Sequence, residues 1–317
     1  MVLNLLKGMT FMFLTGLGSA GNIFVLMNYI YFFRGIEKKS IPLILIHLAF
    51  TNILMLFTKG TPRTIASSGL QNLLGNVGCK LLVYLERVAR GLSICTTSLL
   101  TVVQAITISP RASRWRRLQP RSAWNILLLL LFFWILNAFI SMNVPFYIKN
   151  ISSLNTSEVS NRYTDCYFVA KDFIIRWIFL SLMVLRDATF QGVMGGSSGY
   201  MVFLLHKHHQ HVLYLQTSKL LYKTPPEMKA AQSVLLLMLC FLFFYWTDCF
   251  MTLYSTVSLE NDSIALDVQE FLTLGYAILS SFVLIHRDGH LAACCHEKQR
   301  DDYFRLQGYF LKNLNIQ

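Results

Sequence analysis

The stretch "GCKLLVYLERVARGLSICTTSLLTVVQAITISPRASRW", residues 78–115, decides the fold of this protein. It is apolar over a length that could cross a membrane, which takes about 20 mostly apolar residues. Glu86, Arg87 and Arg90 nevertheless lie in its first half. A charge facing the centre of a bilayer costs about 3 kcal/mol or more. The stretch therefore predicts a helix that turns a polar stripe toward other helices and away from lipid.

The composition indicates a membrane protein that crosses the bilayer several times. The 317 residues are 54% hydrophobic and 14% charged, and the mean hydropathy is +0.48. Soluble domains carry about 25% charged residues. The net charge of +12 does not indicate nucleic acid binding, because the basic residues cluster between apolar runs, as membrane orientation requires. Seven cysteines without a CxxC pattern indicate neither a disulfide framework nor a metal site.

Seven apolar segments predict an all-α seven-transmembrane helix bundle over residues 1–286, followed by a tail over 287–317. The spans are expected at 9–33, 41–60, 78–106, 123–146, 172–205, 230–257 and 267–286. We expect the first span to be retained and not cleaved as a signal peptide. Pro62 is expected to end the second span. The fifth is too long for one straight crossing, and we expect its first part, residues 171–180, to project beyond the bilayer.

The distribution of lysine and arginine predicts the orientation. More than half of the 28 Lys and Arg residues fall in the segments after the first, third, fifth and seventh spans. Positive residues favour the cytoplasmic side. The N-terminus is therefore predicted to be extracellular and the C-terminal tail cytoplasmic, in a multi-pass protein of the plasma membrane.

Acceptor motifs for modification agree with this orientation. The three N-x-S/T motifs begin at Asn150, Asn155 and Asn261, and all fall on the predicted external side. Asn155 is the furthest from a membrane end and is the preferred glycosylation site. Cys294 and Cys295 follow the last span within a few residues. Juxtamembrane cysteines are substrates for palmitoylation, and unmodified thiols are the alternative.

The polar stripe has two interpretations. Glu86 and Arg90 are four residues apart, so they share a helix face and are able to pair. Charged partners on other spans are Asp187, next to Arg186, and Asp248. The stripe is either part of a ligand site or a pair that locks helices together. The ligand site would have apolar walls around it. Its candidate residues are Glu86, Arg87, Arg90, Asp187, Tyr245 and Asp248.

Other motifs indicate partners on the cytoplasmic side and no catalysis. The segment "SPRASRWRRLQPR" is a candidate contact for acidic membrane lipid, besides its role in orientation. Its candidate residues are Arg111, Arg114, Arg116 and Arg117. The run "HKHHQH" at 206–211 has no second cluster of ligands, so a basic helix end is favoured over a metal site. No phosphate loop, HExxH motif or nucleophile–base pattern occurs, so we expect no enzyme and no cofactor.

Four stretches resemble vomeronasal type 1 receptors, a family of G-protein-coupled receptors. They are residues 47–66, residues 78–115, "SSGYMVFLLHKHHQHV" and "SSFVLIHRD". The resemblance implies a chemosensory receptor for small pheromones or other odorants, coupled to a G protein of the Gi/Go class. It also makes the basic segment after the third span a candidate contact for that G protein, through Arg111, Arg114, Arg116 and Arg117. It also supports a disulfide between Cys79 and Cys166, which share the predicted external side; two free thiols are the alternative.

The sequence departs from the family pattern at several positions. Glu86 replaces a usual histidine, Arg186 replaces a proline before Asp187, and Gly196 replaces a tryptophan. Ala277 and Ser281 replace two expected prolines. All seven prolines lie at or before Pro226, so the last three spans contain none. Because proline forms hinges in membrane helices, an alternative is a divergent relative that no longer couples and serves as a partner or chaperone. A transporter is disfavoured, since no internal repeat is evident.

Overall fold

The fold comes from a computed structural model of the full chain. The structure describes residues 2–35, 40–67, 76–110, 123–142, 144–150, 166–168, 173–215, 226–257, 268, 271–272 and 274–286. For some helical residues, Asp248 among them, only the backbone is described.

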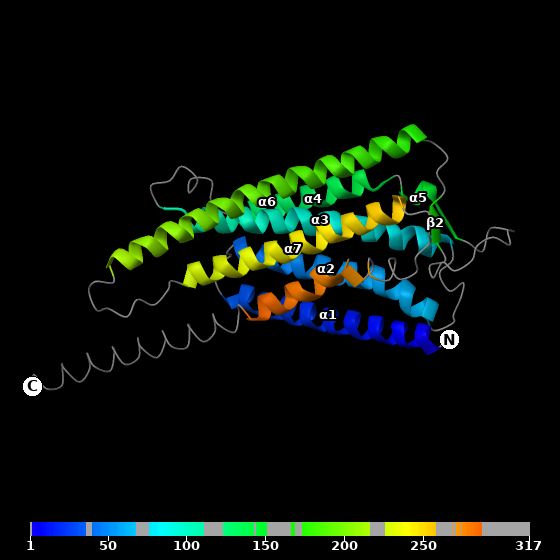
Figure 1. Ribbon diagram of the computed structural model, residues 1–317, viewed down its shortest axis with the longest axis horizontal. Helices are drawn as coiled ribbons and strands as arrows, with labels where there is room; N and C mark the ends of the chain where they lie inside the picture. Colours follow the sequence, from blue (N-terminus) through cyan, green and yellow to red (C-terminus); the bar gives the residue numbers. More distant parts are fainter. Residues whose placement is uncertain are drawn as a thin grey trace, which may run out of the picture.

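Within the described residues, six long helices and one shorter helical segment form a bundle (Figure 1). The predicted seven-helix fold class is confirmed. The long helices are α1 (Val2–Gly35), α2 (Ser40–Ser67), α3 (Asn76–Ile108), α4 (Ala123–Ile140), α6 (Phe173–Leu215) and α7 (Pro226–Val257). The seventh is Leu274–His286, orange in Figure 1 and called the final helix below. The short helix α5 (Val144–Tyr147) leads into strand β1 (Ile148–Asn150), which pairs antiparallel with β2 (Cys166–Phe168).

Five of these helices have described segments that are long and apolar enough to cross a membrane. They are Gly8–Tyr31, Ser40–Gly60, Val77–Ile108, Ala123–Ile140 and Trp177–His208. Shorter apolar helices run over Ala231–Thr247 and Leu274–His286. Large apolar side chains on the outer faces of α1, α4 and α6 are exposed, which suits contact with lipid.

Several helix ends differ from the sequence prediction, and two of them concern the second and fourth spans. The expectation that Pro62 ends the second span is wrong, because α2 continues to Ser67. A proline removes one backbone donor, and a helix is able to continue past it with a local distortion. The fourth helix ends at Ile140, before a turn and the separate helix α5.

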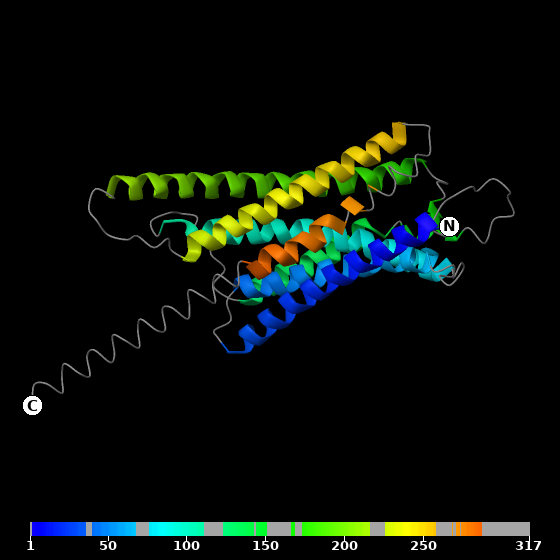
Figure 2. The ribbon, with the colours of Figure 1, turned by 60° about the horizontal axis from the view of Figure 1, so that its bottom comes forward.

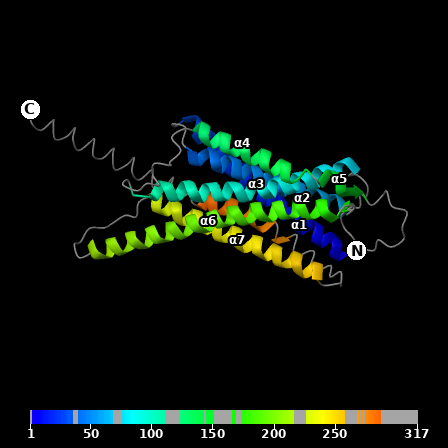
Figure 3. The ribbon, with the colours of Figure 1, turned by 90° about the horizontal axis from the view of Figure 1, so that it is seen from above.

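Helix α6 has 43 residues and no break, so it is about 64 Å long at 1.5 Å per residue. Figures 1 and 3 show it reaching past α3 at the end of the bundle away from the start of α1. The sequence prediction placed the excess length at the opposite end, in residues 171–180. In the structure the helix also continues ten residues past the predicted end at residue 205, to Leu215. Pro226 opens α7, where its missing N–H has no helical partner in any case.

Helix α3 is the centre of the bundle. It contacts α2, α4, α6 and α7, and also α5 and both strands. In its most apolar window 83% of residues are buried, against 17% for α1. Figure 2 shows α1 and α7 running obliquely to α3. The charged stripe of the sequence therefore lies on the most enclosed of these helices, where Glu86, Arg87 and Arg90 are partly buried.

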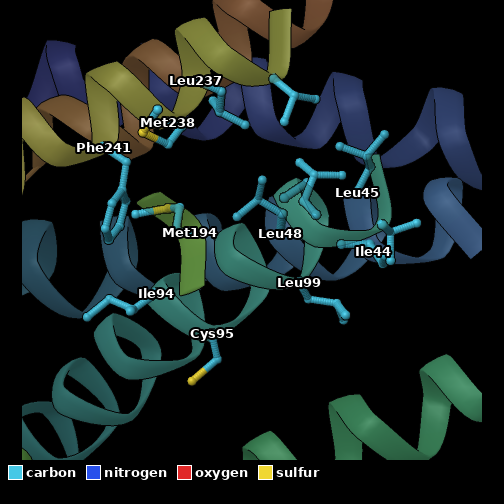
Figure 4. Packing of buried hydrophobic residues seen from close by; sticks show 14 of the residues in the cluster. Ile44, Leu45, Leu48, Ile94, Cys95, Leu99, Met194, Leu237, Met238 and Phe241 are labelled. Carbon is cyan, nitrogen blue, oxygen red and sulfur yellow. The ribbon is translucent and has the colours of Figure 1, made fainter. Parts of the chain in front are cut away.

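Apolar packing around α3 forms one large cluster (Figure 4). Leu48 of α2, Met194 of α6 and Leu237 of α7 are fully buried within it, together with Ile94 and Leu100 of α3. Burial of a side chain of this kind from water contributes about 1.5–3 kcal/mol in a soluble protein. In a bilayer, lipid tails are equally apolar, so close packing of the side chains must hold these helices together.

A polar network joins α1, α2 and the final helix. Asn22 Nδ2 donates to the backbone oxygens of Gly18 and Ala277, each at 2.8 Å. Asn52 Nδ2 donates to Ser280 Oγ at 2.8 Å and to Asn22 Oδ1 at 3.2 Å. All of these side chains are fully buried. Interhelical bonds of this kind are a main source of helix association in membranes.

A second polar chain joins α2, α3 and α4. Trp134 Nε1 donates to His47 Nε2 at 3.0 Å, and His47 Nδ1 lies 2.9 Å from Thr96 Oγ1. Thr96 Oγ1 donates to the backbone oxygen of Leu92 at 2.7 Å. His47 Nδ1 is therefore the donor to Thr96, which assigns the neutral imidazole its proton on Nδ1. Directly after α3, Ser109 Oγ lies 2.9 Å from Tyr200 Oη of α6.

Gly91 allows α3 to approach α4 and α6 closely. A Cβ atom at this position would overlap Asn137 Oδ1 of α4 and Arg186 Nη1 of α6. Gly192 of α6 is different, because nothing lies within 4 Å of a Cβ placed there. The two glycines are therefore a matched pair for testing the packing.

We expect Gly91→Ala to lower the thermal unfolding midpoint of the purified protein, because overpacking of a close contact costs about 1–3 kcal/mol. Gly192→Ala is expected to leave the midpoint unchanged or to raise it, since alanine is the better helix former by about 1 kcal/mol. Equal midpoints for Gly91→Ala and the parent protein would contradict the close approach of α3 to α4 and α6.

Candidate functional site

The charged stripe of α3 begins with an ion pair to α2. Lys59 Nζ lies 2.8 Å from Glu86 Oε1, and both side chains are about one quarter exposed. The pair thus joins the last third of α2 to the first half of α3 while keeping some contact with the surroundings. A partly exposed pair of this kind contributes up to about 1 kcal/mol. The pair also gives the carboxylate of Glu86 a counter-charge, so this carboxylate already has a partner.

One turn further along α3, Arg90 faces an aromatic ring of α7. The guanidinium carbon lies 5.3 Å from the ring centroid of Tyr245, which is within the range of a cation–π interaction. Arg87 lies between Glu86 and Arg90 in the sequence and is partly buried. The stripe therefore contacts both α2 and α7.

A buried cluster joins α4, α6 and α7 next to this stripe. Asp187 Oδ1 lies 2.6 Å from Arg186 Nη2 and accepts a hydrogen bond from Arg186 Nε at 2.7 Å. Tyr245 Oη donates to Asp187 Oδ2 at 2.8 Å. Arg186 Nη1 donates to Asn137 Oδ1 at 2.7 Å, and Asn137 Nδ2 donates to the backbone oxygen of Phe133 at 2.8 Å. The arginine and aspartate are each 7% exposed.

Both oxygens of the Asp187 carboxylate thus have partners, and the neighbouring arginine neutralises its charge. Charge-assisted bonds of this geometry are among the strongest in proteins. Removing one member would leave the other charge buried without compensation.

A small cavity lies beside Arg90, between α2, α3, α7 and the final helix. Its volume is about 30 Å³, which holds about one water molecule. Polar lining is provided by Arg90, Ser93, Tyr245 and Tyr276, and apolar lining by Met55, Phe241, Phe244 and Leu272. In this conformation the space is far smaller than an odorant molecule.

The aromatic walls of the cavity are fixed by contacts with one another. Phe241 packs edge-on against Tyr276, with ring centroids 4.8 Å apart, and stacks on Tyr245 at 6.0 Å. Tyr276 Oη lies 2.9 Å from Thr97 Oγ1 of α3. Gly275 allows Phe244 to approach the final helix, because a Cβ there would overlap the Phe244 ring. The walls are therefore positioned by side chains of three helices.

The structure brings most of the predicted site residues together. Glu86, Arg87 and Arg90 share one face of α3, and Tyr245 links Arg90 to Asp187. The ion pair recorded for Glu86 is with Lys59 and not with Arg90. The side chain of Asp248 lies outside the described residues.

Other predicted sites fall partly or wholly outside the description. The structure records Cys79 as disulfide-bonded. The Cys166 side chain is not described, so this pairing stays a prediction; its backbone begins β2, which contacts α3. The following also lie outside the described side chains: Arg111, Arg114, Arg116, Arg117, Asn150, Asn155, Asn261, Cys294 and Cys295.

Four contributors were not identified from the sequence. Lys59 was assigned to the end of the second span, and Asn137 is a single polar residue within the apolar run "FFWILNAFI". A lone asparagine in a membrane helix is a signal for an interhelical contact, so Asn137 could have been found. Ser93 and Tyr276 have no comparable signal, since small hydroxyl residues and tyrosines are common in membrane helices.

Comparison with known proteins decides the family. A model of the family described as "Vomeronasal organ pheromone receptor family" matches residues 6–297 of the chain. This match covers all of the helices around the site. The chain belongs to the vomeronasal organ pheromone receptor family.

Individual vomeronasal relatives support the same conclusion over nearly the whole chain. The vomeronasal type-1 receptor 4 of Homo sapiens is 31% identical over 287 residues, which cover 90% of this chain and 95% of the relative. Vomeronasal type-1 receptor 43 of Mus musculus is 31% identical, over 98% and 91% of the two chains. Olfactory receptor class A-like protein 1 of Danio rerio is 30% identical, over 91% of each.

The fold is that of a rhodopsin-like receptor. A crystal structure of squid rhodopsin superposes with a TM-score of 0.68 and covers 89% of this chain and 81% of the other. The sequences are only 15% identical, so this likeness concerns the fold alone. This vomeronasal family member is therefore a multi-pass G-protein-coupled receptor of the pheromone receptor family, and it is not an enzyme.

We expect Asp187→Asn to destabilise the purified receptor by about 3–5 kcal/mol, because Arg186 is left buried without a counter-charge. Glu86→Gln removes a carboxylate from a more exposed pair and is expected to cost about 1 kcal/mol or less. Thermal unfolding of both variants in the same lipid environment measures the difference. A smaller loss for Asp187→Asn than for Glu86→Gln would refute the assignment of the buried pair.

Proposed function

We propose that this vomeronasal family member is a chemosensory receptor of the plasma membrane that binds a small pheromone or odorant at the charged stripe and activates a Gi/Go protein. The observation that carries the proposal is the cavity beside Arg90, which lies between four helices and has both polar and aromatic lining. Ligand sites of membrane bundles are typically built from side chains of facing helices. Ionisable groups inside a membrane mark functional sites by default.

The small volume of the cavity supports a mechanism based on a shift between conformations. A ligand larger than one water molecule requires movement of α7 or the final helix away from α3. A ligand that binds the open arrangement better shifts the population toward it. Asp187 and Tyr245 connect the cavity wall to α6, so a displacement of α7 would also act on α6.

The cytoplasmic readout is proposed at the far end of α3. Ser109 Oγ, directly after α3, lies within hydrogen-bond distance of Tyr200 Oη of α6 there. Arg111, Arg114, Arg116 and Arg117 follow in the sequence and are proposed to contact the G protein. Separation of α3 from α6 at this end would change the surface offered to the G protein.

A second candidate function is a divergent receptor that no longer couples and acts as a partner or chaperone. The observation that favours it is the absence of proline from α6 and, past Pro226, from α7 and the final helix. Helices α6 and α7 are accordingly unbroken. Such helices lack the usual hinge of membrane helices. The following experiment separates the two candidates.

We expect Arg90→Ala to weaken ligand-evoked Gi/Go activation by about tenfold or more, because a charged hydrogen bond contributes about 1.5–3 kcal/mol. Glu86→Gln is expected to weaken the response less, since Lys59 already occupies that carboxylate. The measurement is G-protein activation in cells displaying the receptor, stimulated with fractionated urine and gland secretions.

Lys80→Gln, at the start of α3, is the control with a lost charge outside the cavity. Surface amounts must be equal in all samples. If Arg90→Ala leaves the ligand-evoked response unchanged, the ligand does not bind at the cavity beside Arg90. No response from a well-displayed receptor, when a coupling relative responds in parallel, would favour the second candidate.

The proposed orientation has a separate test. With the N-terminus outside, Asn155 lies on the lumenal side during synthesis, and we expect Asn155→Gln to reduce or abolish a glycosidase-sensitive mass shift of the protein. Asn150→Gln and Asn261→Gln serve as comparisons for the other two acceptors. A parent protein with no glycosidase-sensitive shift would argue against an external position of this loop.

A further inference from the structure

We propose that the hydrogen bond from Tyr245 to Asp187 is a reversible lock between α6 and α7 that limits the activity of the receptor in the absence of ligand. The lock is a statement about the two helices alone. Its consequence for signalling rests on the proposed function, to which it adds a named restraint and the single hydroxyl group that forms it.

The position of the counter-charge makes this bond reversible. Arg186 and Asp187 are neighbours on α6, and Arg186 reaches Asp187 Oδ1 through both Nε and Nη2. Tyr245 Oη of α7 donates to the other oxygen, Oδ2, at 2.8 Å. Because the carboxylate keeps its arginine when α7 moves away, separation of the helices does not leave an unpaired buried charge. Separation of α7 therefore costs one hydrogen bond and no ion pair.

The other side of the same cluster is anchored. Arg186 Nη1 donates to Asn137 Oδ1 of α4 at 2.7 Å, and Asn137 Nδ2 is itself bonded to the backbone oxygen of Phe133. Phe133 also packs edge-on against Phe190 of α6, with ring centroids 5.4 Å apart. Gly91 lets α3 approach both the arginine and the asparagine. At this level α6 is thus fixed to α3 and α4, so relative movement falls to α7.

Apolar contacts where α7 crosses α6 tolerate such a movement. Figures 2 and 3 show α7 running obliquely to α6. Met194 of α6 and Met238 of α7 belong to the same apolar cluster (Figure 4). Methionine is flexible and adapts to changes in the shape of its surroundings. A hydrogen bond depends steeply on distance and angle, so the Tyr245 hydroxyl supplies a directional restraint that the methionines do not.

The lock is also placed where a bound molecule would act on it. Tyr245 lines the cavity beside Arg90, and its ring stacks on Phe241. A molecule that displaces this ring draws the hydroxyl away from Asp187. Without such a molecule, the strength of the hydrogen bond sets the population of the separated arrangement.

Tyr245→Phe tests the lock, because it removes the hydroxyl and retains the ring with its contacts to Arg90 and Phe241. A hydrogen bond to a charged group changes an equilibrium constant by a factor of about ten or more. We expect ligand-independent Gi/Go activation to rise about five- to tenfold from a low basal level. The measurement is made in cells that display equal surface amounts of each variant.

Tyr84→Phe is the matched control. Tyr84 Oη of α3 donates to the backbone oxygen of Ala138 of α4 at 3.4 Å, so this variant also removes a tyrosine hydroxyl that bonds to another helix. Tyr84 does not line the cavity beside Arg90. We expect it to leave both the basal activity and the relation of α6 to α7 unchanged.

A distance measurement tests the lock without any G protein. Nitroxide labels are attached to p-acetylphenylalanine at positions 207 of α6 and 232 of α7, where Lys207 and Gln232 are exposed, so the native cysteines stay in place. Pulsed electron paramagnetic resonance of the purified receptor in lipid nanodiscs gives the distribution of distances. We expect one main population in the parent protein and in Tyr84→Phe, and a second, distinct population in Tyr245→Phe.

The two readouts separate failure of the lock from failure of the proposed function. An unchanged distance distribution in Tyr245→Phe, or the same second population in Tyr84→Phe, would overturn the lock. A second population without increased G-protein activation would leave the lock and sink the coupling proposal. Increased activation at unchanged distances would leave the receptor and overturn the lock.

Discussion

The structure depends on the need to compensate a charged group taken out of water. Arg186 and Asp187 meet this need through their mutual ion pair, and their remaining polar atoms reach Asn137 on α4 and Tyr245 on α7. Gly91 on α3 provides the space in which the arginine and the asparagine meet. One buried pair on α6 thus contacts side chains of α4 and α7 and packs at the Gly91 position of α3. The same contacts also position a wall of the neighbouring cavity, because Tyr245 bonds to Asp187 and lines the cavity.

The positions at which the chain departs from the usual family pattern take structural roles here. Arg186, where a proline is usual, is the centre of the buried cluster. Ala277, in place of another proline, offers its backbone oxygen to Asn22 of α1. Ser281, in place of a third, lies against Gly21, where a Cβ would approach Ser281 Oγ to 2.6 Å. These residues replace hinges by interhelical contacts, which ties the final helix and α6 more firmly to their neighbours.

The sequence was sufficient for the helix count and for the inward direction of the α3 stripe, because both follow from the cost of exposing polar groups to lipid. The partners of that stripe were not predictable in the same way. Lys59 pairs with Glu86 across two helices whose relative height and rotation no single-chain pattern specifies. Pro62 misled the prediction of a helix end, since a lost backbone donor distorts a helix without always ending it. Asn137 was detectable in principle as a polar residue in an apolar run, whereas the hydroxyl of Ser93 acquires meaning only from the cavity beside it.

The length of α6 has a mechanical consequence. Its 43 residues form one continuous rod, about twice as long as the hydrocarbon layer of about 30 Å is thick. A rod of this length converts rotation into displacement: a tilt of about 5° around its midpoint moves each end by about 3 Å. The buried pair at residues 186 and 187 lies in the first half of the rod, and Tyr200 lies in the second half. A ring movement at Tyr245 too small to open a wide channel would therefore be amplified, by leverage alone, at the opposite face of the membrane.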